Sequence, residues 1–253
     1  MRVNDKIKLL EENTNQIFFI HYSCENLNDA NEGYSPRITS IAVLHMASAQ
    51  MSSFSMHLIA EEMHISRENI SEKYNEIEVE MLQRFFAYAE SKGYEAKWLH
   101  WNMINVNFGF ETLEHRYRVL IGENPYHIDE KNRYNISSLL SQKYGSNYAK
   151  DPKMVNLMEL NGGKHREFLT GAEEVTAFKA NEFIKMHNST MCKVKFFESV
   201  FRKMSKNKLK TNTNQFRYKI NEIYQNPIVQ LIGIIGVFGT IVSLIATLVY
   251  GGG

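Results

Sequence analysis

The chain has 253 residues, of which 43% are hydrophobic, and this is enough for one sizeable core. Its 29 basic and 28 acidic residues nearly cancel, so the whole molecule is not an obvious binder of polyanions. Cys24 and Cys192 are the only cysteines, which excludes a disulfide framework and a four-thiolate zinc site and indicates a reducing compartment. Residues 1–12 are charged throughout and predict no signal peptide.

The chain after residue 12 alternates between strand patterns and helix patterns. Apolar, β-branched and aromatic runs predict strands at residues 16–24, 37–47, 51–60 and 97–103. Helical spacing of apolar residues predicts a helix that begins after Ser66 and ends at Gly93. Further helical patterns cover residues 108–120, 135–144, 155–160, 172–183 and 193–204. This order of elements predicts an α/β fold with a mixed sheet.

An uncharged, apolar stretch covers residues 228–250. A helix of about 20 apolar residues crosses the ~30 Å hydrocarbon core of a bilayer, so we predict one transmembrane helix here, with Pro227 at its start. A basic stretch without acids precedes it and contains Arg202, Lys203, Lys206, Lys208, Lys210, Arg217 and Lys219. Positive charge stays on the cytoplasmic side, so we expect a single-pass protein of the inner (cytoplasmic) membrane with its N-terminal domain in the cytoplasm.

This C-terminal part predicts two kinds of partner. The basic residues between 202 and 219 either lie on anionic lipid headgroups, at about 1 kcal/mol each, or form a solvated linker over residues 201–227. In the predicted transmembrane helix Gly239, Ser243 and Thr247 are four residues apart and share one face. Small residues on one face let helices approach closely, which predicts a homo-oligomer, although glycine is also common in membrane helices in general.

Three short segments carry polar residues where predicted strands end or helices begin. They are residues 22–25 (Tyr-Ser-Cys-Glu), residues 98–111, which begin Trp-Leu-His-Trp-Asn, and residues 171–178 (Gly-Ala-Glu-Glu-Val-Thr-Ala-Phe). Together with the order of elements, they resemble the DEDD-type 3′–5′ exonucleases of the ribonuclease H-like fold. The sequences IHYSCE (residues 20–25) and WLHWN (residues 98–102) also resemble those of a group of bacterial proteins.

The resemblance implies a ribonuclease H-like domain over residues 1–200 that acts on DNA or RNA with Mg²⁺ or Mn²⁺. Such cations prefer oxygen ligands, and a pair of them activates water in this family. The implied metal ligands are Ser23, Glu25, Asn107, Glu111 and Glu174, and the implied catalytic residues are Glu25, His100, Glu173 and Glu174. The chain departs from the family at Ser23, where the family has Asp, and at Phe168, where it has His.

The same residues also have structural interpretations. Glu25 either needs a partner at the end of an apolar strand or already lies solvated in the following loop. His100 and Asn102 either line a site beside Glu25 or form a satisfied buried pair. Glu173 and Glu174 also fit acids that complement a helix dipole in its first turn.

Three functions therefore stay open from the sequence. The first is a membrane-tethered, metal-dependent nuclease, with a role in bacterial phage defence. The second is a catalytically inactive exonuclease-like domain that senses a ligand or a protein partner and has an oligomerising tail that disturbs the membrane. The third is a tail-anchored scaffold for another protein.

Overall fold

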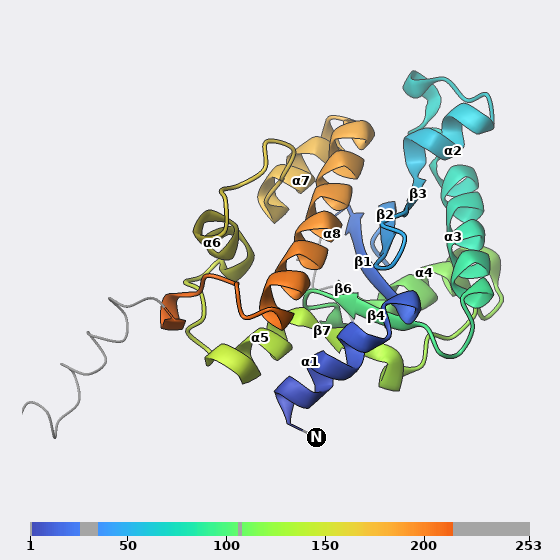
Figure 1. Ribbon diagram of the computed structural model, residues 1–253. Helices are drawn as coiled ribbons and strands as arrows, with labels where there is room; N and C mark the ends of the chain where they lie inside the picture. The colour runs from blue at the N-terminus through green and yellow to red at the C-terminus, as the bar shows by residue number, and fades with distance from the viewer. Residues whose placement is uncertain (1, 26–34, 106–107, 215–253) are drawn as a thin grey trace, which may run out of the picture.

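The computed structural model describes residues 2–25, 35–105 and 108–214 (Figure 1). Asn107, the predicted transmembrane helix at 228–250 and its small-residue face lie outside the described residues. Within the described ranges, no helix is both long enough and apolar enough to cross a membrane.

A mixed five-stranded sheet lies at the centre of the molecule, which confirms the predicted α/β class. Its strand order is β3-β2-β1-β4-β7. The central strand β1 is antiparallel to β2 and parallel to β4, β2 is antiparallel to β3, and β4 is parallel to β7. The strands cover Ile17–Cys24 (β1), Ile38–His45 (β2), Met51–Ser55 (β3), Lys97–His100 (β4) and Arg133–Asn135 (β7). A separate small hairpin joins β5 (Ile104–Asn105) and β6 (Phe108–Gly109).

Helices cover both faces of this sheet (Figure 1). The helices are α1 (Val3–Glu12), α2 (Met56–Glu62), α3 (Tyr74–Ser91), α4 (Phe110–Ile121), α5 (Ile136–Tyr144), α6 (Lys153–Leu160), α7 (Gly171–Lys179) and α8 (Phe183–Ser205). Short 3₁₀ turns occupy Thr14–Gln16, Arg67–Asn69, Glu130–Asn132 and Asn212–Asn214.

Strand β1 belongs to two hydrophobic cores because side chains alternate between the faces of a strand. Phe18, Ile20 and Tyr22 pack with α3 and α4 on one face. Ile17 and Phe19 pack with α1, α5 and α8 on the other. All eight residues of β1 are buried, as expected for a central strand that is covered on both sides.

The structure corrects several predicted elements. The expected strand at 51–60 ends at Ser55, and the chain continues as α2, because Met56, Ile59 and Ala60 are buried with helical spacing. The expected helices at 172–183 and 193–204 have different limits, because α8 already begins at Phe183. Helix α1 and strand β7 were not predicted. In α1 only Ile7 and Leu10 are buried among charged residues, and β7 is only three residues long.

Candidate functional site

A cavity of about 430 Å³ opens at the carboxyl end of β1. Residues 21–24 of β1 line it, together with Trp101 and Asn102, which follow β4, and Glu174 and Lys193 from α7 and α8. Strands β1 and β4 are parallel, so their carboxyl ends meet at the same edge of the sheet. Ligands of open α/β sheets commonly bind beyond the carboxyl ends of the strands.

A buried ion pair forms the polar side of this cavity. The Oε1 atom of Glu174 accepts a hydrogen bond of 2.6 Å from Nζ of Lys193. The same oxygen accepts from the hydroxyls of Ser23, at 2.9 Å, and Ser189, at 3.2 Å. Glu174 is 6% exposed and Lys193 is 5% exposed, so both charges are removed from water. The pair therefore joins α7, α8 and the end of β1 in one charge-neutral cluster.

The hydroxyl groups around Glu174 have fewer protons than contacts. The Oγ atom of Ser23 lies 2.9 Å from Glu174 and 2.7 Å from Oγ1 of Thr190. That Thr190 oxygen also lies 2.9 Å from the carbonyl oxygen of Met186. Each hydroxyl carries one proton, so the three contacts cannot all be hydrogen bonds at the same time. The cluster has more than one proton arrangement available without moving a heavy atom.

His21 brings an unused polar group to the same cavity. Its side chain is 5% exposed and lies edge-on to the rings of Phe108 and Phe197, at 5.7 and 5.6 Å. Burial lowers the pKa of His21 well below its ordinary value, and the charge of Lys193 adds to this, so the imidazole is neutral at pH 7. Its Nδ1 atom has no hydrogen-bond partner among the described residues. A buried nitrogen without a partner calls for an explanation, and His21 is one of the residues that line the cavity.

The structure brings together only part of the predicted site. Ser23 and Glu174 are in contact although they are 151 residues apart in the chain. Glu25 follows β1 at a bend, where its N–H donates to the carbonyl oxygen of Arg37, and it is not among the described residues that line the cavity. The pairing of β1 with β2 shifts register between Ser23 and Cys24, and this shift ends the alternation that would place Glu25 beside Ser23.

Glu25 acts instead on a second buried ion pair. Burial opposes the charge of Arg116, but its contact with Glu78 raises the pKa of this guanidinium. Glu25 adds a smaller contribution of the same sign. Glu25 is therefore electrostatically linked to the pair between α3 and α4, away from the cluster around Glu174.

His100 belongs to the core on the opposite face of the sheet. Its Nδ1 accepts the N–H of Met103 at 3.1 Å, and its ring lies edge-on to Phe110. Burial lowers the pKa of His100 to about 4, assisted by the charge of Arg133. Of the predicted pair His100 and Asn102, only Asn102 lines the cavity, where it has a left-handed backbone with φ of 54°.

The remaining predicted residues have structural partners. Glu111, in the first turn of α4, forms an ion pair with Arg133. Glu173 closes a capping box at the start of α7, because its Oε2 accepts the N–H of Thr170 at 2.6 Å while its own N–H donates to the Thr170 hydroxyl. Both carboxylates have lowered pKa values. Burial opposes the charge of Glu111, but hydrogen bonds from the backbone of α4 and from Arg133 lower its pKa. Hydrogen bonds from Thr170 are the main cause of the lowered pKa of Glu173.

The residues of the cavity do not fit a pair of divalent metal ions. Glu174 supplies the only carboxylate among the described lining residues, and the ammonium of Lys193 already contacts it. Two-metal sites need several anionic oxygen ligands to balance the charge of the ions. In the part of the chain that the structure describes, no group of three His, Cys, Asp or Glu residues could hold a metal ion.

Lys193 is the main residue that the sequence interpretation missed. It was expected at the first position of a helix, where a lysine is ordinarily solvated. In the structure it lies in the interior of α8, on the buried face between Thr190 and Phe197. The signal that could have found it is a lysine three and four residues from core positions within an amphipathic helix.

Comparison with protein-family models, with curated proteins and with solved structures found no match. The residues that line the cavity are therefore the basis for assigning a function.

Proposed function

We propose that residues 1–200 form an exonuclease-like domain of the ribonuclease H-like type that binds a ligand without cutting it. The strand order supports this topology, because three antiparallel strands are followed by a helix and then by strands parallel to β1. The position of the cavity supports it as well, because Ser23 and Glu174, which the resemblance implies as metal ligands, are in contact at its wall.

The observation that carries the loss of catalysis is the 2.6 Å contact between Lys193 and Glu174. A divalent cation at Glu174 would have to displace an ammonium group of the same sign. Ser23, which replaces an anionic ligand of the family, would leave such a cation without charge balance. Lys193 therefore provides from within the fold the positive charge that a metal supplies in an active nuclease.

The lining of the cavity favours a planar polar ligand such as a nucleobase at the end of a nucleic acid strand. His21 and Asn102 provide hydrogen-bonding groups, and Trp101 and Phe108 provide aromatic surface. Single-stranded nucleic acids are bound through this combination of stacking and hydrogen bonds to base edges. Helix α8 leads from the site toward the basic segment. Ligand binding would therefore act through α8 on the predicted transmembrane helix and on its oligomerisation.

The test is a combined binding and cleavage assay on the full chain in phosphatidylcholine nanodiscs. Labelled single-stranded DNA and RNA are supplied with Mn²⁺, Mg²⁺ or EDTA. We expect binding that EDTA does not change, no cleavage, and binding weakened by about tenfold in Asn102→Ala, the equivalent of ~1.4 kcal/mol. Glu173→Gln, which changes the exposed neighbour of Glu174, serves as the matched control and retains binding. Failure of the wild-type chain to bind either strand would exclude the proposed ligand and favour a scaffold for a protein partner.

The alternative is the metal-dependent nuclease, which is favoured by the convergence of Ser23 and Glu174 at the end of β1. It requires cleavage by the wild-type chain with Mn²⁺ or Mg²⁺ that Glu174→Gln abolishes and Glu173→Gln retains. That result would overturn the non-catalytic proposal. Glu25→Gln is informative in the same assay, because the position of Glu25 away from the cavity predicts no effect on cleavage.

A further inference from the structure

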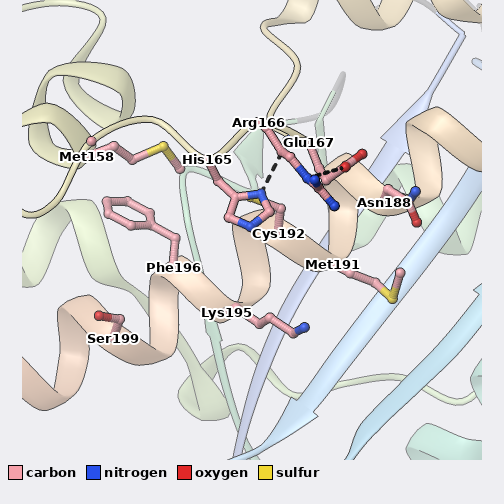
Figure 2. A pocket seen from close by; sticks show the side chains of 11 residues that line it. Met158, His165, Arg166, Glu167, Asn188, Met191, Cys192, Lys195, Phe196 and Ser199 are labelled. Carbon is pink, nitrogen blue, oxygen red and sulfur yellow. Dashed lines mark hydrogen bonds and ion pairs between the residues drawn. The ribbon is translucent and has the colours of Figure 1, made fainter.

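A second cavity, of about 480 Å³, lies against a different face of α8 from Lys193. Figure 2 shows His165, Arg166 and Glu167 on the loop that passes over the helix, with Lys195 and Phe196 on the helix itself. Met158, at the end of α6, stands across from Phe196. This volume lies in the range of about 300–1,000 Å³ that is typical of sites for small molecules.

The floor of this cavity is apolar and adaptable. It includes Met158, Met191, Cys192 and Phe196. Met158 and Cys192 also belong to a small hydrophobic cluster with Phe168. Methionine side chains are flexible and polarisable, so such a floor adapts to alkyl or aromatic groups of different shape.

The rim of the cavity is basic. Two basic side chains, Arg166 and Lys195, face one acid, Glu167, and Arg166 pairs with that acid at 3.0 Å. Neither Lys195 nor His165 forms an ion pair with another of the described residues. Nδ1 of His165 accepts the N–H of Glu167 at 3.2 Å. Among the described residues, the positive charge of Lys195 has no anionic partner, and it lies beside an apolar surface.

The charge of Lys195 reaches the floor. Burial raises the pKa of the Cys192 thiol, and the charges of Lys193 and Lys195 act in the opposite direction. Positive charge next to a low-polarity surface attracts anions more strongly than the same charge in open water. Asn188 and Ser199 add uncharged hydrogen-bonding groups at the edges.

We propose that this cavity binds a small amphipathic anion, with a single carboxylate, sulfonate or phosphate on a short alkyl or aromatic body. The acidic group lies against Lys195 and His165, and the apolar body lies against Met158, Met191 and Phe196. A bare anion would leave this floor uncovered, and a neutral apolar molecule would leave Lys195 unpaired. The inference is independent of the ligand proposed for the cavity at Glu174.

Cys192 provides a reporter within the cavity, and Cys24, in β1, provides an internal control. The full chain in phosphatidylcholine nanodiscs is treated with N-ethylmaleimide, and mass spectrometry follows the alkylation of each cysteine. The probe is decanoate, compared with decanol and decyltrimethylammonium. At a concentration of about five times its dissociation constant, decanoate is expected to slow alkylation of Cys192 about sixfold and to leave Cys24 unchanged. Hydrogen exchange of residues 158–170 gives a second reading of protection that does not depend on thiol reactivity.

Two substitutions test separately the contribution of the Lys195 charge and that of the apolar floor to binding. Lys195→Glu is expected to remove protection by decanoate, whereas Lys179→Glu, at an exposed position on α7 away from this cavity, is expected to retain it. Met191→Trp, which fills the cavity, is expected to remove protection without changing a charge. Equal protection by decanol and decanoate, undiminished protection in Lys195→Glu, or no protection by decanoate in either measurement would overturn the proposal.

Discussion

Each face of the sheet buries an ion pair, Glu78 with Arg116 on one face and Glu174 with Lys193 on the other, and these two pairs are built differently. Between α3 and α4, the guanidinium of Arg116 contacts both carboxylate oxygens of Glu78, and the N–H of Ile38 donates to the same carboxylate at 2.6 Å. Beside α7, Lys193 and two hydroxyls all donate to the single oxygen Oε1 of Glu174.

The difference separates a structural charge pair from one that is suited to a ligand. A guanidinium is planar and matches a carboxylate at both oxygens, so the pair at Glu78 is fully used within the fold. An ammonium is a compact point charge on a flexible chain, and the pair at Glu174 lies along a cavity wall.

The largest effect is expected for Arg116→Met. This change leaves the Glu78 carboxylate, which is fully buried, without a counter-charge, and the free energy of unfolding should fall by about 3–5 kcal/mol. Urea unfolding of the reconstituted chain measures the loss. The double variant Glu78→Leu with Arg116→Met removes both charges and should recover most of the stability. A double variant as unstable as the single one would contradict the assignment of the cost to an unpaired charge.

A smaller loss, of about 2–3 kcal/mol, is expected for Lys193→Met in the same assay. Ser23 and Ser189 still donate to Glu174, so the carboxylate keeps two of its hydrogen bonds when the ammonium is removed. Adding Glu174→Gln should restore most of the stability. The comparison between the two faces fails if Lys193→Met costs as much as Arg116→Met.

Acid should destabilise both faces of the sheet through buried histidines, His100 on one face and His187 together with His21 on the other. The pKa of His100 and that of His187 are lowered to about 4, in both cases first by burial, so both rings are neutral in the fold. Unfolding restores the ordinary pKa of about 6.5, so this stability is complete above pH 6.5 and is lost as the pH falls toward 4, by about 3 kcal/mol per ring. In His187→Gln, the free energy of unfolding should therefore change less between pH 7 and pH 4 than it does in the wild-type chain. The exposed His115 provides a control, and His115→Gln should leave the slope unchanged.

The smallest effects are expected at the start of α7, where two neighbouring glutamates have different roles. Thr170→Ala removes the capping hydroxyl and should cost about 1 kcal/mol, and Glu173→Gln, which keeps an acceptor, should cost less than about 0.5 kcal/mol. Glu174→Gln should change ligand binding at the first cavity, which Glu173→Gln should not. Equal effects of the two glutamine substitutions on binding would contradict their separate assignment.

The sequence predicted the α/β class and the positions of the long strands because apolar runs and their spacing report burial directly. It did not predict the helix at Met56, because a short alternating pattern fits either element. Ser23 and Glu174 were singled out by the resemblance, and the structure has Ser23 near the end of β1 and Glu174 in the first turn of α7. The position of Glu25 depends on a register shift between paired strands, and that of Lys193 depends on a partner 19 residues away in another helix. Neither relation is visible in local sequence.

Strand β1 has a consequence for how the domain opens. Its residues contribute to both hydrophobic cores, and it pairs with β2 on one side and β4 on the other. Neither core can therefore be lost while the other keeps its central strand. The two layers of helices should melt in one cooperative transition, with the amide protons of β1 among the last to exchange with solvent.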